Sequence, residues 1–285
     1  MNLNKLMTKI LNGKKIAEGI LQNLSEKITQ ASLKPGLAVV LVGEDPASHL
    51  YTELKGEACE QVGIHYERYL FSQTVNQEEV MEKIKELNSQ KDIHGIIVQL
   101  PLPKHLDESE IISAIAPEKD ADGFHPQNIE EFQQGQLTVV SPLLQAIKTF
   151  LSQTNQNLSR KKGVVLGNSD LFVKNVEIVL SRLGIKSAHY HDTYHGSASL
   201  KEADVIVTAL GQAECLKGEM IMPGAIIIDV GINKVDGQTV GDVDRKSVAG
   251  RAGYLTPVPG GVGPMTVAYL LENTYQLAKN INEKR

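Results

Sequence analysis

The sequence predicts an α/β protein with two domains, an N-terminal α/β domain and a second, Rossmann-like domain. Short apolar runs alternate along the chain with segments of helical apolar spacing. Strands that alternate with helices in this way form a parallel sheet covered on both faces. A second series of the same kind begins at the glycine-ended run 163–167, and the 285 residues are enough for two ordinary domains.

The composition excludes several classes of protein. Hydrophobic residues make up 41% and charged residues 22% of the chain, as is typical of a globular protein. The net charge of -5 argues against a general nucleic-acid surface, and no apolar run approaches the roughly 20 residues that span a bilayer. Cys59 and Cys215 indicate no disulfide framework, and the N-terminus lacks the apolar core of a signal peptide. We therefore expect a cytoplasmic protein without nucleic-acid or membrane partners.

The elements of the first series follow from apolar periodicity and capping residues. Ile16, Ile20 and Leu24 repeat at helical spacing, and the continuous apolar run 37–42 is typical of a buried strand. Asp45 and Pro46 then suit the first turn of a helix. In order, we predict helix 14–28, strand 37–42, helix 46–62, strand 64–71, helix 78–87, strand 93–100 and helix 108–115.

The second series follows a polar segment, 128–136, which we interpret as a crossing between domains. Apolar runs and helical spacing then continue the alternation to the end of the chain. In order, we predict helix 142–152, strand 163–167, helix 171–183, strands 186–190, 204–210 and 225–230, and helix 267–281.

Tyr51 and Lys55 are the first candidate functional residues. They lie four residues apart on helix 46–62, so their side chains share a face one turn apart. That helix follows a buried strand, and open α/β sheets bind ligands at the carboxyl ends of their strands. A water-excluding pocket lowers the pKa of an amine, which would make Lys55 a general base. The alternative is a solvated surface pair.

Three further stretches carry candidate ligand-binding residues. Gln99 interrupts an apolar strand near its end, just before Leu100 and two prolines. Asp122 lies in an acidic turn before a glycine, and its carboxylate suits the paired N–H groups of an aminopyrimidine ring. The loop 255–266 combines stiffening prolines with glycines that let the backbone approach a flat ligand. Taken singly, each stretch also has a purely structural explanation.

Together and in this order, these stretches resemble the methylenetetrahydrofolate dehydrogenase/cyclohydrolase family over nearly the whole chain. The resemblance implies an N-terminal α/β catalytic domain, formed by 1–141 with 267–285, and a Rossmann-like dinucleotide-binding domain, 142–266. It also implies a homodimer through the second domain. The activity implied is oxidation of 5,10-methylenetetrahydrofolate with NADP or NAD, followed by hydrolysis of the methenyl product to 10-formyltetrahydrofolate.

The resemblance also assigns roles to the candidate residues. Lys55 handles proton transfer as water adds to the methenyl carbon, Gln99 hydrogen-bonds Lys55, and Tyr51 stacks near the pterin ring. Asp122 holds the pterin edge. The other residues expected to bind the tetrahydrofolate substrate are Leu100, Pro259, Gly260 and Gly261. The residues expected to bind the dinucleotide are Gly167, Asn168, Ser169, Asp192 and Ile232.

The dinucleotide turn departs from the family pattern, Gly-Arg-Ser followed by Val-Gly-x-Pro. Asn168 stands at the arginine position and Val173 at the second glycine, where we expect a β-branched side chain to disturb the helix start. Asp192 stands where the family has a serine that helps to hold the 2′-phosphate of NADP. We therefore expect poor NADP binding and either a preference for NAD or little dehydrogenase activity. Lys174 is a candidate replacement cation.

Other functions are weighed against the bifunctional enzyme. A cyclohydrolase without a working nucleotide site and a non-enzymatic folate-binding paralogue remain as alternatives. A short-chain dehydrogenase is rejected because its Tyr-x-x-x-Lys motif follows the glycine turn, whereas here the motif precedes Gly167 by a domain. His189 and His191 share a strand face, but no ligand set with metal spacing accompanies them apart from Asp192, so we expect no metal.

Overall fold

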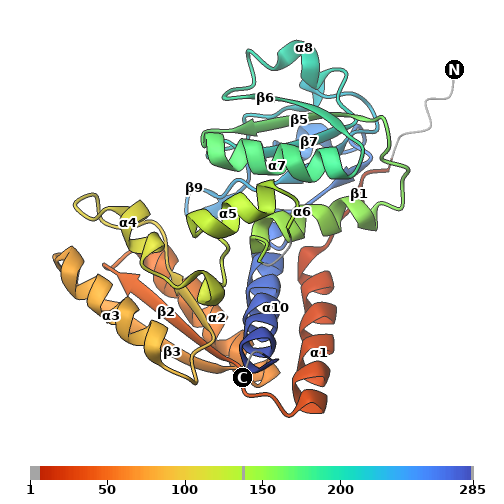
Figure 1. Ribbon diagram of the computed structural model, residues 1–285. Coiled ribbons are helices and arrows are strands. Elements are labelled where there is room, and N and C mark those ends of the chain that lie inside the picture. The colour runs from red at the N-terminus through yellow and green to blue at the C-terminus, as the bar shows by residue number, and fades with distance from the viewer. Residues whose placement is uncertain (1–6, 137–138, 284–285) are drawn as a thin grey trace, which may run out of the picture. The chain divides into compact units, whose positions relative to one another are not determined.

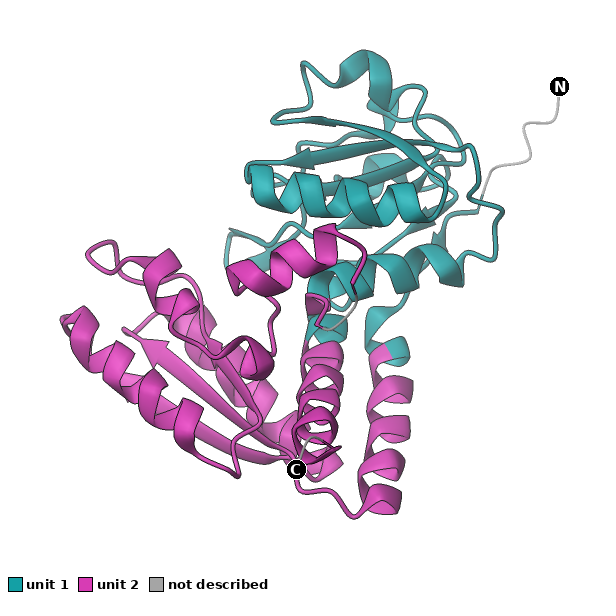
Figure 2. Cartoon of the chain, viewed as in Figure 1, with its two compact units in different colours: residues 1–16, 143–266 teal, residues 17–142, 267–285 magenta. Residues whose placement is uncertain are grey.

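The structure is a computed structural model that describes residues 7–136 and 139–283. Its contacts divide the chain into two compact units: unit 1 comprises 1–16 with 143–266, and unit 2 comprises 17–142 with 267–285 (Figure 2). This division differs from the predicted one at the N-terminus, where β1 (Lys9–Ile10) pairs with β11 (Tyr254–Leu255) of unit 1. Helices α1 (Gly13–Ala31) and α10 (Val262–Glu283) begin in unit 1 and continue in unit 2.

Unit 2 is built on a three-stranded parallel sheet in the order β3-β2-β4 (Figure 1). β2 (Gly36–Val42) is the central strand and is buried along its whole length, as a continuous apolar run predicts. β3 (His65–Phe71) and β4 (Gly95–Val98) flank it. The helices that accompany the sheet are α2 (Pro46–Val62), α3 (Gln77–Ser89), α4 (Glu108–Ser113), the 3-10 turn η1 (Pro117–Lys119) and α5 (Pro126–Gln133).

The long helices α1 and α10 lie side by side in unit 2 (Figure 1), where Lys27 and Glu272 form an ion pair of 3.1 Å. Asn273 of α10 donates hydrogen bonds to the backbone carbonyls of Ala121 and Val140, each at 2.9 Å. These bonds fasten Ala121, the residue before Asp122, and Val140, further along the chain, to one helix. The turn that carries Asp122 is therefore held from its amino-terminal side by α10.

Unit 1 contains a six-stranded sheet in the order β1-β11-β8-β7-β5-β6. All of its pairings are parallel. β5 lies between β6 and β7: the connection that leaves β5 leads to β6 and the one that leaves β7 leads to β8, so the two connections diverge at the carboxyl ends of β5 and β7. In an open α/β sheet that divergence marks the ligand crevice. Gly167, the last residue of β5, lies at this point.

The remaining elements of unit 1 cover the sheet or connect its strands, and α7 lies over β5 and β6 (Figure 1). They are α6 (Pro142–Gln153), β5 (Lys162–Gly167), α7 (Asp170–Arg182), β6 (Lys186–Tyr190), α8 (Ser197–Leu200), β7 (Val205–Ala209), η2 (Gly218–Met220), β8 (Ile226–Asp229), β9 (Asn233–Val235), β10 (Gln238–Val240) and α9 (Arg245–Val248).

The structure confirms the predicted α/β class and most predicted elements, with two corrections. The polar segment predicted as a crossing, 128–136, is largely helical, because α5 begins at Pro126 and is capped by His125. The last helix begins at Val262 rather than at 267, since Pro264 lies in its first turn, where no N–H is needed. In the described part of the chain, none of the helices is long and apolar enough to cross a membrane.

Candidate active site

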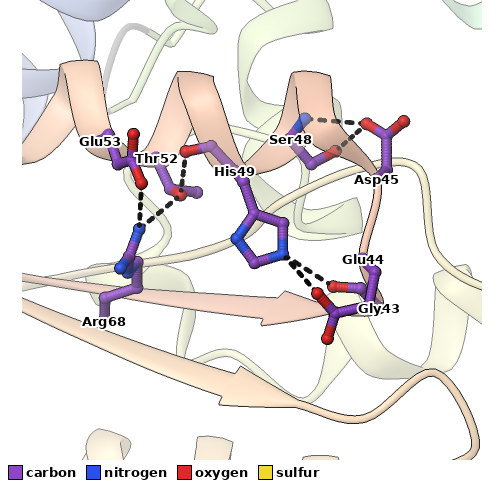
Figure 3. A network of polar contacts seen from close by, with 8 residues as sticks. All are labelled: Gly43, Glu44, Asp45, Ser48, His49, Thr52, Glu53 and Arg68. Atoms are coloured by element: carbon purple, nitrogen blue, oxygen red, sulfur yellow. Dashed lines mark hydrogen bonds and ion pairs between the residues drawn. The ribbon is translucent and has the colours of Figure 1, made fainter.

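The candidate catalytic helix α2 is anchored firmly at its first turn (Figure 3). The Asp45 carboxylate accepts hydrogen bonds from the backbone N–H and the hydroxyl of Ser48, both at 2.8 Å, and so caps the helix. His49 Nε2 lies 3.1 Å from the carbonyl oxygen of Gly43, which directly follows β2. The start of α2 is thereby tied to the end of the central strand.

A second set of contacts fixes the rotation of α2 about its own axis. The Tyr66 hydroxyl on β3 donates to the carbonyl of Thr52 at 2.7 Å, and the buried Thr52 hydroxyl donates to the carbonyl of His49 at 2.9 Å. Arg68 pairs with Glu53 at 3.6 Å on the same side (Figure 3). Tyr51 and Lys55, which follow at helical spacing, are therefore held in defined directions.

Lys55 of α2 forms a hydrogen bond with Gln99, which directly follows β4. Its Nζ donates to Gln99 Oε1 at 2.9 Å, while Gln99 Nε2 donates to the carbonyl of Leu100 at 2.8 Å. The second bond fixes the orientation of the amide, so that its oxygen faces the amine. The structure therefore brings together three of the predicted residues, and the partner of the amine is a neutral acceptor.

Burial controls the ionisation of the groups around this pair. Burial lowers the pKa of Lys55, and the nearby carboxylate of Asp122 opposes this effect only in part. Burial also raises the pKa of Tyr51. Cys59, one helical turn after Lys55, is fully buried, and burial raises the pKa of its thiol to about 12. The thiol is neutral, so the amine gains no anionic partner on that side.

Asp122 lies in a turn that is organised by its neighbour Asp120. The buried Asp120 carboxylate accepts hydrogen bonds from Gly123 N at 3.0 Å, His125 N at 2.8 Å and Asn128 Nδ2 at 2.8 Å. Burial raises the pKa of Asp122 to about 6, while Lys55 lowers it and Asp120 raises it further. Asp120, which was not singled out from the sequence, therefore holds the backbone of this turn in place.

The proline and glycine loop lies in unit 1. Gly260 adopts a left-handed conformation with φ of 94°, and its carbonyl accepts a hydrogen bond of 3.0 Å from Lys14 N. A Cβ on Gly261 would lie 2.3 Å from the carbonyl oxygen of Pro257, so the loop admits no side chain there. Pro259 is exposed. The contact of Pro259, Gly260 and Gly261 with the folate remains a prediction.

The glycine turn of unit 1 joins β5 to α7. Ser169 caps α7 by accepting a hydrogen bond from Phe172 N at 3.3 Å. A Cβ on Gly167 would lie 2.8 Å from the Phe172 ring, which explains the glycine. The Asn168 side chain donates to the carbonyl of Leu210 after β7. The turn therefore presents the amino end of a helix, which attracts anions, at the carboxyl ends of the strands.

Val173 does not disturb this turn in the way that the sequence suggested. Its side chain is only 1% exposed, and its Cγ2 lies 3.5 Å from the position of a Cβ on Gly167, so it is buried against the turn and not exposed on its solvent side. Ile232, another predicted cofactor residue, is 51% exposed and lies three residues beyond the end of β8. Asp192 lies two residues beyond the end of β6.

Two buried carboxylates in unit 1 were not predicted. Asp242 accepts hydrogen bonds from Leu210 N at 2.6 Å, Gln212 N at 3.0 Å and Asn233 Nδ2 at 3.1 Å. Asp229 accepts from Asp242 N at 3.1 Å, and burial raises its pKa to about 7. The available sequence signal was Asp229, an acid at the end of an apolar strand with a glycine two residues later. Its partners are distant in sequence and emerge only with the fold.

Comparison with known proteins agrees with these features. The family model described as the tetrahydrofolate dehydrogenase/cyclohydrolase catalytic domain matches residues 11–122. The model of the NAD(P)-binding domain of the same family matches residues 142–282. Two proteins called bifunctional protein FolD are similar throughout. That of Nautilia profundicola is 40% identical, with 95% of this chain and 97% of the relative covered. That of Geotalea daltonii is 42% identical, with 96% and 99% covered.

Solved structures give the same result. The FolD methylenetetrahydrofolate dehydrogenase/cyclohydrolase of Campylobacter jejuni is 36% identical, with a TM-score of 0.91 over 96% of this chain and 99% of that one. The enzyme of Trypanosoma brucei, solved with NADP and an inhibitor, is 31% identical, with a TM-score of 0.91 over 97% and 99%. This chain belongs to the tetrahydrofolate dehydrogenase/cyclohydrolase family.

The buried Asp242 generates the first prediction. Asp242→Asn replaces one acceptor oxygen by a donor, so at least one buried N–H or hydroxyl loses its partner, at a cost of about 1–3 kcal/mol for each. We expect a lower free energy of unfolding by urea denaturation. Asp244→Asn is the matched control, because the Asp244 carboxylate only caps the short α9. Equal effects of the two substitutions would contradict the special role of Asp242.

Proposed function

We propose that this protein oxidises 5,10-methylenetetrahydrofolate with a nicotinamide dinucleotide and hydrolyses the 5,10-methenyl product to 10-formyltetrahydrofolate. The observation that carries the proposal is the partly buried amine of Lys55, which is hydrogen-bonded to the neutral amide of Gln99 near Asp122. The family of the chain supports the same pair of reactions. The direct test is spectroscopic: methenyl formation is measured with NADP and with NAD, beside methenyl hydrolysis.

Lys55 supplies the proton chemistry of the hydrolysis. Its lowered pKa favours the neutral amine, which accepts a proton from water as the water oxygen bonds to the electrophilic methenyl carbon. The resulting ammonium then returns a proton to the ring nitrogen as the carbon–nitrogen bond breaks. Gln99 accepts a hydrogen bond from the amine in either state, so it orients the group without adding a charge.

The substrate is held by the residues around this amine. The Asp122 carboxylate accepts the paired N–H groups of the pterin ring, which are a matched donor pair for two oxygens. Tyr51 contributes its ring face to the pterin, and the backbone at Leu100 lines the same site. Pro259, Gly260 and Gly261, in the loop of unit 1, are proposed as further residues that contact the folate through their backbone. The tetrahydrofolate derivative is therefore recognised through its planar heterocycle.

The nucleotide occupies the glycine turn of unit 1. Gly167 permits close approach, Ser169 caps the helix, and the first N–H groups of α7 face the pyrophosphate. Asn168, Asp192 and Ile232 border the same strand ends. These residues would hold a nicotinamide dinucleotide, which would supply a hydride acceptor for oxidation of the methylene carbon. Because Val173 is buried, it does not block this site, and the cyclohydrolase-only alternative loses its main support.

The cellular setting is proposed with the activity. We place the enzyme in the cytoplasm as a homodimer that pairs through the nucleotide-binding unit, as the family resemblance implies. Size-exclusion chromatography with light scattering measures the assembly directly: twice the chain mass of 31.1 kDa is expected, and a monomer at assay concentration would contradict the dimer.

Loss of the Lys55 amine tests the hydrolytic mechanism. Lys55→Met keeps the length of the side chain but removes the base, so we expect methenyl hydrolysis to fall by at least about 10²-fold, the lower range for general acid–base catalysis. Circular dichroism should show an intact fold. Lys85→Met, on the exposed face of α3, is the matched control. Near wild-type hydrolysis in a folded Lys55→Met protein would refute the assignment.

Loss of the Asp122 carboxylate tests substrate recognition. Asp122→Ala removes a charge-assisted hydrogen bond worth about 1.5–3 kcal/mol, so the folate KM should rise roughly tenfold or more. The exposed Asp92→Ala serves as a control for loss of an acid in the same unit. If calorimetry shows unchanged folate binding in the Asp122 variant, the residue is only part of a turn.

The pKa of Asp122 predicts a pH dependence of folate binding. The carboxyl is ionised above about pH 6 and protonated below it, and only the ionised form accepts both N–H groups of the ring. The folate KM of the wild-type protein should therefore rise as the pH falls below about 6. The Asp122→Asn variant should have a high KM without this inflection. A wild-type KM that is flat through this range would count against the contact.

A further inference from the structure

The end of β6 lies directly beside the glycine turn. β5 and β6 pair in parallel register, with Leu166 opposite Tyr190, so the next residues of both strands leave the sheet together. His191 Nδ1 lies 2.8 Å from the carbonyl oxygen of Gly167, and its N–H is the donor because a carbonyl only accepts. The segment after β6 is thus fastened to the turn.

Asp192 is held in one orientation at this place. Its Oδ1 accepts a hydrogen bond from His195 N at 2.7 Å, and its Oδ2 lies 2.6 Å from His195 Nδ1. Its hydrogen bonds with His195 lower the pKa of Asp192, so the group is a carboxylate at neutral pH. Its side chain is 38% exposed, which leaves oxygen lone pairs open to a ligand. The acid is fixed, charged and accessible.

Two acids, Asp192 and Asp170, lie at this place, and the basic groups beside them are histidines: His195 contacts Asp192 and His191 faces Asp170. Asp170 at the start of α7 is 93% exposed in its side chain and lies 3.7 Å from His191 Nε2. Neither the segment 167–173 nor the segment 189–200 contains a lysine or an arginine. The Asn168 amide is already engaged with the carbonyl of Leu210. A phosphate placed beside Asp192 would face its carboxylate with no lysine or arginine on either segment, and the neighbouring lysine in sequence is Lys174.

We infer that the segment His191–His195 takes an adenosine ribose whose 2′-hydroxyl is free, so that this enzyme uses NAD in preference to NADP. In dinucleotide folds, an acid after the second strand accepts a hydrogen bond from that hydroxyl. Esterification of the 2′-oxygen removes the hydrogen and brings a dianion against Asp192 and Asp170. The inference rests on the proposed dehydrogenase function and specifies its cofactor.

The test begins with the full-length wild-type protein. Titration of NAD and of NADP at equal ionic strength should show NAD binding at least tenfold tighter. The difference should shrink as salt is added, because the repulsion is electrostatic and salt screens exposed charges. Tighter binding of NADP than of NAD would overturn the inference.

Variants locate the effect. Asp192→Ser should weaken NAD binding, strengthen NADP binding and change their ratio at least tenfold toward NADP. Asp236→Asn, in the exposed β9–β10 turn of the same unit, is the matched control and should leave the ratio unchanged. Methenyl hydrolysis reports the fold of each variant. An unchanged ratio of NAD to NADP affinity in Asp192→Ser would also overturn the inference. The same holds if the ratio changes only in a Lys174→Ala variant, which removes the next lysine in sequence.

Oxidation assays separate this inference from the proposed function. Rapid oxidation of methylenetetrahydrofolate with NADP and slow oxidation with NAD would refute the cofactor assignment while leaving the proposed function intact. Binding of neither dinucleotide, with hydrolysis retained, would remove the dehydrogenase activity and the cofactor assignment together.

Discussion

The amine of Lys55 lies in a partly buried position where its fixed hydrogen-bond partner is a neutral amide. An ammonium group in such a place is destabilised by burial, and the carboxylate of Asp122 offsets this only in part. Much of unit 2 serves to maintain that balance. The Asp45 cap and the Tyr66 hydroxyl fix α2, Leu100 fixes the Gln99 amide, and Asp120 fixes the turn that carries Asp122.

Unit 1 also orders the ends of its strands with internal hydrogen bonds, in this case around the glycine turn. Its buried carboxylates, Asp229 and Asp242, are satisfied by uncharged donors and connect the ends of β7 and β8. Asn168 adds the end of β5 through Leu210. Because these bonds are internal, the helix amino end and the fixed acid Asp192 remain available to a ligand. Unit 1 therefore suits a dinucleotide because its strand ends are ordered in advance, and not because many side chains contact the ligand.

The features that were predictable from sequence are those that periodicity and topology determine. Tyr51 and Lys55 share a helix face by spacing, and topology places Gln99 at the carboxyl end of its strand. The hydrogen bond between Gln99 and Lys55 was expected only from the family resemblance. The family pattern has a glycine at the position of Val173. The structure shows that the Val173 side chain is buried.

Hydrogen bonds and strand pairings between residues far apart in the chain could not be predicted from the sequence. The bonds of Asp242 to Leu210 and Gln212 join residues about thirty positions apart. The β9–β10 hairpin was also missed, although Asp236 and Gly237 at its turn are a recognised hairpin signal. The pairing of β1 with β11, which joins the two ends of the described unit 1 chain, has no local signal, since each strand has only two residues.

The central claim is that the Lys55 amine is easily deprotonated in the folded protein. Nitrogen-detected NMR titration of lysine side chains measures this directly, with Lys55 assigned by its absence from the Lys55→Met spectrum. Because burial lowers the pKa of the Lys55 amine, we expect Lys55 to lose its proton at a pH below the ordinary lysine value of 10.5. A Lys55 titration that coincides with those of the exposed lysines would contradict the account.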